Sequence, residues 1–230
     1  MYEQKAFILN NRLKTCASMV QTGAKLADIG TDHAYLPVWL AKNNMIKHAI
    51  AADIKKGPLE MAKRNIEKYS LEDKVETRLS DGLEKINENE VDNIVIAGMG
   101  GELIASIISK ALWLKNSSKN LVLQPMSMAK ELRNFLRNEN FEIKEEIAVI
   151  DSKRAYTVMR AMYTENNILC DDLYPYVGKL QYPFSDEAKG YLKREINNIH
   201  NKIKGYKITK NYDKANELNN IVLKIEDLLK

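Results

Sequence analysis

Short apolar runs and amphipathic segments alternate along this chain from residue 25 to about residue 140. Hydrophobic periodicity predicts strands at 25–30, 48–53, 74–80, 91–98 and 120–125, and helices at 34–44, 57–70, 101–114 and 128–140. Such alternation predicts a parallel α/β sheet with helices on both faces, because parallel strands are joined by crossover helices. Residues 141–151 and 153–163 follow each other without a helix, so we expect an antiparallel pair at one edge of the sheet.

The two ends of the chain carry helical patterns of their own. An amphipathic helix is expected over residues 5–20, before the first strand. After residue 163 the periodicity disappears, and from residue 186 two amphipathic helices flank a turn at 209–211, which predicts an antiparallel helical hairpin of coiled-coil type. We therefore expect a main domain at 1–165, a linker at 166–185 and a hairpin at 186–230.

Composition excludes several classes of protein. The net charge of +4 permits an anionic partner without requiring one. Cys16 and Cys170 lie far apart and lack metal-ligand spacing, so we expect a reducing cytoplasmic setting with neither a disulfide framework nor a metal site. No apolar run approaches the about 20 residues that a membrane span needs, and the N-terminus does not resemble a signal peptide.

Polar residues stand where the first two predicted strands end. Asp28, Gly30, Asp32 and His33 fall at the turn from the first strand into the first helix, and Asp53 closes the second strand. Ligands of such sheets bind at the carboxyl ends of the strands, and an acid after the second strand can accept hydrogen bonds from ribose hydroxyls. Two alternatives remain open: Asp32 only caps the following helix, and Asp53 is a solvated strand end.

The charge of this turn bears on the choice of ligand. A dinucleotide site has the pattern G-x-G-x-x-G, whereas residues 28–33 read DIGTDH and carry an aspartate in place of one of the glycines. A carboxylate would repel a pyrophosphate and attract a sulfonium cation and an amino group. The sequence therefore favours S-adenosylmethionine over NAD.

Two further turns follow the third and fourth predicted strands. Asp81 and Gly82 could hold an adenine through its exocyclic amine, or form an ordinary Asp-Gly turn. Residues 98–101 read GMGG and lack the Lys-Ser/Thr pair of a phosphate-binding loop. The stretch is therefore not expected to be a phosphate-binding loop.

Taken in order, these stretches resemble the bacterial tRNA adenine-22 N1-methyltransferase family. The resemblance rests on DIGTDHAYLP at 28–37, the acid after AIAA, KGP at 56–58, the Asp81-Gly82 turn, IAGMGG at 96–101, LVLQPM at 121–126 and the terminal hairpin. It covers nearly the whole chain. One departure is Asp53, where the family is expected to carry a glutamate; the shorter acid offers the same acceptor atoms.

The resemblance implies a Rossmann-like class I methyltransferase domain that binds S-adenosylmethionine. By position, Asp28, Gly30 and His33 would line its methionine end, Asp53 and Ile54 its ribose, and Asp81 and Gly82 its adenine. The backbone beneath the methyl group would comprise Ala97, Gly98, Met99 and Gly100.

The implied substrate is the D-arm region of tRNA, bound by a monomer without metal or membrane. Asp32 is the candidate catalytic residue, since a carboxylate stabilises the cationic product ring. Gly98, Gly100 and Gly101 would leave room for a flipped purine, with Tyr35 or Met99 stacking on it. Arg12 is expected to contact phosphate or base, or else to be a solvated surface charge.

The first arm and the tip of the hairpin carry far more lysines and arginines than acids. We expect these residues to grip the RNA backbone, namely Lys193, Lys202, Lys207 and Lys210. The alternatives to a tRNA methyltransferase are a small-molecule methyltransferase and a non-catalytic tRNA-binding module that retains the cofactor fold.

Overall fold

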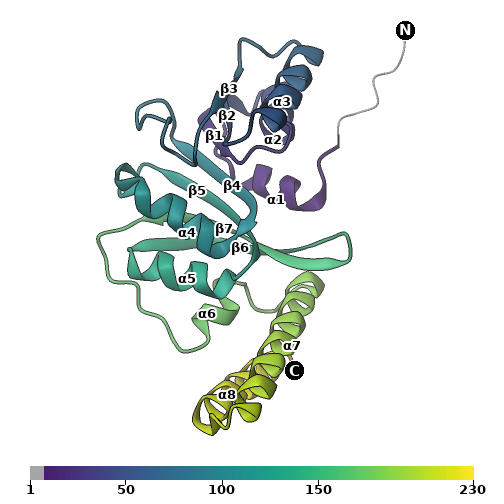
Figure 1. Cartoon of the computed structure of the whole chain (residues 1–230), viewed down its shortest axis with the longest axis vertical. Coiled ribbons are helices and arrows are strands. Elements are labelled where there is room, and N and C mark those ends of the chain that lie inside the picture. Colours follow the sequence, from purple (N-terminus) through teal and green to yellow (C-terminus); the bar gives the residue numbers. More distant parts are fainter. Residues whose placement is uncertain (1–7) are drawn as a thin grey trace.

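A seven-stranded sheet with helices on both faces forms the main body of the computed structural model, which describes residues 8–230 (Figure 1). Its strands are β1 (Ala24–Ile29), β2 (Ile46–Asp53), β3 (Val75–Leu79), β4 (Asn93–Gly100), β5 (Asn120–Ser127), β6 (Phe141–Asp151) and β7 (Arg154–Tyr163). They are ordered β3-β2-β1-β4-β5-β7-β6, with β1 to β5 parallel and β7 antiparallel to both of its neighbours. The predicted parallel α/β sheet with an antiparallel edge pair is confirmed.

The helices that precede β6 divide between the two faces of the sheet (Figure 1). In chain order, the helices are α1 (Asn11–Met19), α2 (Tyr35–Lys42), α3 (Lys56–Lys68), α4 (Gly101–Lys110), the 3-10 helix η1 (Leu112–Leu114), α5 (Ala129–Asn138), α6 (Tyr174–Val177), α7 (Asp186–Ile208) and α8 (Tyr212–Leu228). One apolar core lies beneath α1, α2 and α3, and a second lies beneath α4 and α5. The central strands are apolar on both sides because both of their faces are covered.

The reversal of strand order beside β1 positions the functional region. β1 pairs with β2 on one side and with β4 on the other, so the crossover connections leave in opposite directions. This arrangement opens a crevice at the carboxyl ends of the strands, where ligands of doubly wound sheets bind.

Several element boundaries differ from the sequence-based expectation by a few residues, and the helix expected at 101–114 ends at Lys110, before η1. Two of the differences lie beside the functional region. Helix α1 starts at Asn11 and not at residue 5, because the side chain of Asn10 accepts a hydrogen bond from the backbone N–H of Leu13 at 2.9 Å and caps the helix there. Residues 5–7 of the expected helix lie outside the described residues. Strand β4 extends to Gly100, two residues beyond the expected end, through an irregularity in its pairing with β5.

The terminal hairpin forms as expected. Helices α7 and α8 pack against each other around a third apolar cluster. Its members include most of the positions on which the hairpin was predicted, namely Leu192, Ile196, Ile199, Ile203, Ala215, Val222 and Ile225. The segment expected as a linker contains a helical turn, α6, that packs against α5 and buries Tyr174 and Tyr176.

A buried ion pair joins this segment and the hairpin to the sheet. Arg133 of α5 lies 2.6 Å from Glu146 of β6, and both side chains are fully shielded from solvent. Glu146 also accepts from the hydroxyl of Thr157 at 2.6 Å and from the backbone N–H of Lys179 at 2.9 Å. Arg133 also donates to the hydroxyl of Tyr191 on α7 at 3.0 Å. Five segments of the chain, α5, β6, β7, the residue stretch after α6 and α7, therefore share one polar network.

Arg133→Met is expected to lower the free energy of unfolding by roughly 3–5 kcal/mol, because it leaves the Glu146 carboxylate buried without its partner. The matched control is Arg160→Met. Arg160 pairs with Glu145 at 3.3 Å on a partly exposed surface, where loss of a pair costs about 1 kcal/mol or less. Urea denaturation of the two variants measures the difference, and equal losses would contradict the structural role given to Arg133.

Candidate active site

A cleft of about 260 Å³ lies where β1, β4 and β5 end. We call it the α1 cleft, because α1 forms one of its walls. Its lining comprises Asn10, Arg12, Leu13, Asp28, Gly30, Asp32, Leu36, Ala97, Gly98 and Met126. The structure therefore brings together six of the residues singled out from the sequence, although Arg12 and Gly98 are far apart along the chain.

Asp28 is the buried acid of the α1 cleft. It lies at the end of β1, is 6% exposed and accepts a hydrogen bond from the Thr31 hydroxyl at 2.5 Å. Burial raises the pKa of Asp28 to about 6; the Thr31 hydrogen bond opposes this rise, and the charges of Asp32 and Asp53 add to it. A ligand cation placed here would favour the ionised form and relieve the repulsion among the three acids.

Gly30 meets Met99 across the cleft. Its φ is +70°, and a Cβ at this position would lie 2.1 Å from the Cε atom of Met99. The backbone N–H groups of Gly30 and Thr31 both donate to the carbonyl of Ala52, at 2.8 and 2.9 Å. The left-handed turn therefore favours glycine at this position, and the flexible end of Met99 fills the space that a side chain would occupy.

Asp32 projects into the cleft mouth with 77% of its side chain exposed. It does not cap α2: the N-cap residue is Ala34, in a left-handed conformation, and no side chain bonds to that helix end. The capping alternative is therefore wrong.

The backbone of His33 is also in the left-handed conformation, and its ring lies 3.7 Å from the Asp32 carboxylate and 3.3 Å from the Tyr35 hydroxyl. Tyr35 stands next to His33 and does not line the cleft.

Asp53 and Ile54 occupy the end of β2. One carboxylate oxygen of Asp53 accepts from the backbone N–H of Lys55 at 2.7 Å, which holds the side chain in place. Ile54 is 60% exposed, unusually high for an isoleucine at the end of a buried strand. The pair offers an oriented acceptor beside an open apolar surface, outside the lining of the α1 cleft.

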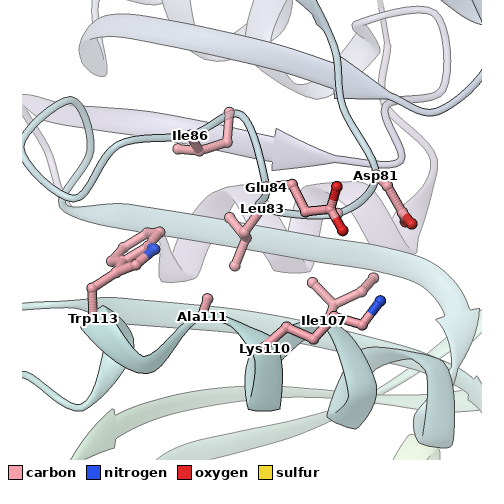
Figure 2. A pocket seen from close by; sticks show the side chains of 9 residues that line it. Asp81, Leu83, Glu84, Ile86, Ile107, Lys110, Ala111 and Trp113 are labelled. Carbon is pink, nitrogen blue, oxygen red and sulfur yellow. The ribbon is translucent and has the colours of Figure 1, made fainter.

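A second hollow of about 270 Å³, the α4 pocket, lies between the turn after β3 and helix α4. Figure 2 shows Asp81 and Glu84 toward one end of it and Trp113 and Ile86 at the other. Gly82 has a φ of +54°, and a Cβ there would press on Ile107 of α4 at 3.0 Å. Asp81 and Gly82 therefore border this hollow as well as forming the turn after β3.

The glycines of residues 98–101 have different roles. Gly98 is exposed, has a φ of +79° and has open space where a Cβ would lie. A Cβ on Gly100 would lie 3.5 Å from the Ser127 hydroxyl, which is an ordinary contact distance. Gly101 is buried, and a Cβ there would lie 2.2 Å from the carbonyl oxygen of Met128. The expectation that Gly101 clears space for a base is wrong, since its missing side chain makes room for the start of α5.

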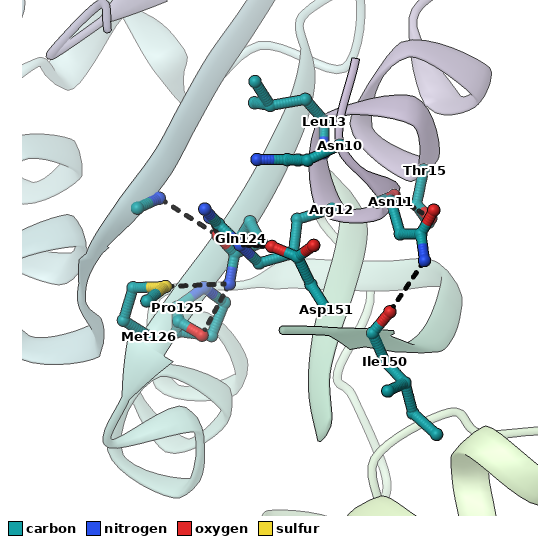
Figure 3. A network of polar contacts seen from close by, with 11 residues as sticks. Asn10, Asn11, Arg12, Leu13, Thr15, Gln124, Pro125, Met126, Ile150 and Asp151 are labelled. Carbon is teal, nitrogen blue, oxygen red and sulfur yellow. Dashed lines mark hydrogen bonds and ion pairs between the residues drawn. The ribbon is translucent and has the colours of Figure 1, made fainter. Parts of the chain in front are cut away.

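The side chain of Arg12 is largely buried and paired, so the alternative that Arg12 is a solvated surface charge is wrong. Its Nε donates to Asp151 at 2.9 Å and its Nη1 to the side-chain carbonyl of Gln124 at 2.7 Å (Figure 3). The preceding residue of α1, Asn11, donates to the carbonyl of Ile150 at 2.9 Å. Helix α1 is thus fastened to the end of β6, 139 residues away.

Sequence reasoning missed Gln124. It is fully buried at the end of β5, and its side-chain oxygen also accepts from the backbone N–H of Gly98 at 3.1 Å. The available signal was a lone amide within the apolar run LVLQP, because a buried polar side chain must find hydrogen-bond partners. The remaining lining residues that were missed are Asn10, Leu13, Leu36 and Met126.

The predicted RNA-gripping lysines lie away from the cleft on or just after α7. Lys193, Lys207 and Lys210 are exposed, and Lys202 approaches Glu131 of α5 at 4.0 Å. Within residues 8–230, no group of three or more His, Cys, Asp or Glu side chains is arranged to hold a metal ion. In the same range, no helix is long and apolar enough to cross a membrane.

Comparison with known proteins agrees with this geometry. Residues 9–159 match the family model described as a methyltransferase domain. The chain is 37% identical, over 188 residues, to the tRNA (adenine(22)-N(1))-methyltransferase of Bacillus subtilis strain 168, which covers 81% of this chain and 79% of that protein.

Two solved structures have the same fold over nearly their whole length. A Streptococcus pneumoniae protein in complex with S-adenosyl-L-methionine superposes with a TM-score of 0.80 at 30% identity, covering 95% of this chain and 98% of that one. M. capricolum TrmK in complex with S-adenosyl-homocysteine superposes with a TM-score of 0.81 at 28% identity, covering 96% and 99%. The chain belongs to the tRNA (adenine(22)-N(1))-methyltransferase family.

Proposed function

We propose that this protein transfers a methyl group from S-adenosylmethionine to N1 of adenine 22 in the D-arm of tRNA. The observation that carries the proposal is the α1 cleft, where the carboxylates of Asp28 and Asp32 face the backbone of Gly98 at the reversal of strand order. Membership of the family supports the substrate, and the crystallised relatives bind the proposed cofactor or its product.

The residues at the strand ends fit S-adenosylmethionine. Asp28 would attract the cationic methionine end, Asp53 and Ile54 would hold the ribose, and Asp81 and Gly82 would border the adenine. In this arrangement Gly30, His33, Gly82, Ala97, Met99 and Gly100 supply the surrounding backbone. An anionic dinucleotide would instead meet three nearby carboxylates, which disfavours it.

Methyl transfer to a ring nitrogen makes modest demands on this chain. Bound S-adenosylmethionine supplies an electrophilic methyl group, and as the N1–CH₃ bond forms and the S–CH₃ bond breaks, the positive charge passes to the adenine ring. Adenine N1 already has an in-plane lone pair, so no residue needs to remove a proton before attack. The chain would act by alignment, with the exposed Asp32 carboxylate stabilising the developing charge.

The target base must reach the α1 cleft from a paired arm. Flipping it costs a few kcal/mol, and open space beside Gly98 leaves room for the base. We propose that Arg12 contacts the substrate and that Met99, which lies against Gly30, is the candidate stacking partner. The expected alternative, Tyr35, does not line the α1 cleft, so we do not propose it. Lys193, Lys202, Lys207 and Lys210 would bind the RNA backbone, with the enzyme acting as a cytoplasmic monomer.

Incubation with labelled S-adenosylmethionine tests the reaction class. We expect label in unmodified bulk tRNA, and none in a small-molecule extract depleted of RNA. Label in small molecules alone would support the alternative of a small-molecule methyltransferase. Cofactor binding by calorimetry without any transfer would support a non-catalytic tRNA-binding module.

Asp32→Asn tests the proposed catalytic carboxylate. The methyl-transfer rate at saturating cofactor should fall by about 10²-fold, because stabilisation of the product charge is lost. The dissociation constant of S-adenosylhomocysteine should change by less than about threefold, since the side chain is mostly exposed. Equal losses in rate and in cofactor affinity would reduce Asp32 to a binding residue.

Asp28 should make cofactor binding pH-dependent. The ionised carboxylate attracts the ligand's amino group, and its pKa in the free protein is about 6. Lowering the pH from 7 to 5 should therefore weaken S-adenosylhomocysteine binding by about tenfold, as measured by calorimetry. Asp28→Asn should bind weakly at both pH values and show no such slope; an unchanged slope would assign the titration to another group.

Charge reversal on α7 tests the RNA surface while leaving the fold in place. Removing residues 186–230 would expose a buried cluster, so point changes are the sharper test. Lys193→Glu/Lys207→Glu should weaken tRNA binding by about tenfold near 0.1 M salt and flatten its salt dependence. The matched control is Lys25→Glu/Lys47→Glu, which makes the same change in net charge at two exposed lysines near the amino ends of β1 and β2. Equal effects from both pairs would refute a specific role for the hairpin.

A further inference from the structure

Gln124 is a polar side chain in a place where the sheet is otherwise apolar. It is fully buried near the end of β5, directly after the buried apolar residues 121–123. An amide in such a setting is unfavourable unless its hydrogen-bonding groups are satisfied. The partners of this amide therefore indicate what the residue does.

Each end of the amide has defined partners. The side-chain oxygen accepts from the backbone N–H of Gly98 at 3.1 Å and from Nη1 of Arg12 at 2.7 Å. The side-chain nitrogen donates to the carbonyl of Pro125 at 2.9 Å (Figure 3). Because both groups at the oxygen are donors and the group at the nitrogen is an acceptor, only one orientation of the amide satisfies all three contacts.

The bond to Gly98 completes an irregular stretch of the sheet. In the pairing of β4 with β5, Ala97 lies opposite Gln124 and Met99 opposite Pro125, so Gly98 is the extra residue. Such a bulge residue loses its partner in the ladder. The Gln124 side chain supplies the acceptor that the strand backbone does not, and so fixes the turn that presents Gly98 to the cleft and Met99 to Gly30.

The hydrogen bond from Arg12 connects the same Gln124 amide to α1, the opposite wall of the cleft. Arg12 lies on α1, is held at its other edge by Asp151, and has its guanidinium carbon 5.6 Å from the centre of the Tyr156 ring. Its Nη2 makes no hydrogen bond to any of residues 8–230, although the side chain is only 18% exposed. The arginine therefore keeps one donor group for a ligand while its own charge is paired.

We propose that Gln124 is a positioning residue for methyl transfer, which sets the distance between the Gly98 backbone and the Arg12 guanidinium across the α1 cleft. This inference rests on the proposed function, in which these two groups face the cofactor and the base. Gln124 itself is buried behind the cleft wall and acts only through its neighbours. A substrate held by Arg12 would thereby be placed in register with the transferred methyl group.

A double-mutant cycle tests this coupling in the full-length protein. Gln124→Met removes the amide at similar volume and should lower kcat by about 30-fold at saturating cofactor and tRNA, because small misplacements cost large factors in rate. Arg12→Met should cause a similar loss, and the double variant should lose little more than either single one. The control is Gln181→Met, which applies the same substitution to an exposed glutamine and should leave kcat unchanged.

Two binding and exchange measurements separate positioning from a general structural role. S-adenosylhomocysteine affinity should change by less than about threefold in Gln124→Met, and hydrogen exchange of the Gly98 amide should quicken in that variant but not in Arg12→Met. Losses that multiply in the double variant, an unchanged kcat, or a parallel loss of cofactor affinity would each overturn the proposal. If the wild-type protein fails to methylate tRNA, the proposed function is wrong. The hydrogen-exchange rate of the Gly98 amide still tests the contact with Gln124 in that case.

Discussion

The pairing of β1 with β4 is the interaction on which the functional region depends. These strands are distant in sequence, yet their parallel register sets Ile29 beside Ile96 at the carboxyl edge of the sheet. Because β1 pairs with β2 on its other side, the connecting helices diverge and leave the crevice open. The end of β1 with the following residue Asp32, and the bulge of β4 at Gly98, consequently border the same cleft.

Around that crevice, side-chain contacts between residues far apart in sequence fix the positions of α1 and of the β4 bulge. Arg12 and Asp151 fasten α1 to the end of β6, and Gln124 joins α1 to the bulge of β4. A separate buried pair, Arg133 with Glu146, connects the sheet to the segment before the hairpin. The proposed catalytic wall and the proposed RNA-binding hairpin are thus anchored by different networks within one body.

Much of the architecture was predictable because its signals are local. The alternation of apolar runs with amphipathic helices gave the parallel sheet, and aspartates at strand ends marked the ligand edge. The hairpin followed from the spacing of residues such as Leu192 and Ile196. What could not be predicted depends on non-local packing: Met99 lies on Gly30, Met128 fills the space beside Gly101, and Asp151 pairs with Arg12. A glycine in sequence signals a close approach without identifying the group that approaches.

In the proposed reaction, the α1 cleft delivers a methyl group to the Watson–Crick edge of one adenine. The most direct measurement is nucleoside mass spectrometry combined with reverse-transcription arrest mapping of unmodified tRNA treated with the protein and S-adenosylmethionine. We expect 1-methyladenosine at position 22 and an arrest at that nucleotide. Methylation of the exocyclic N6 atom, or of a nucleotide outside the D-arm, would contradict it.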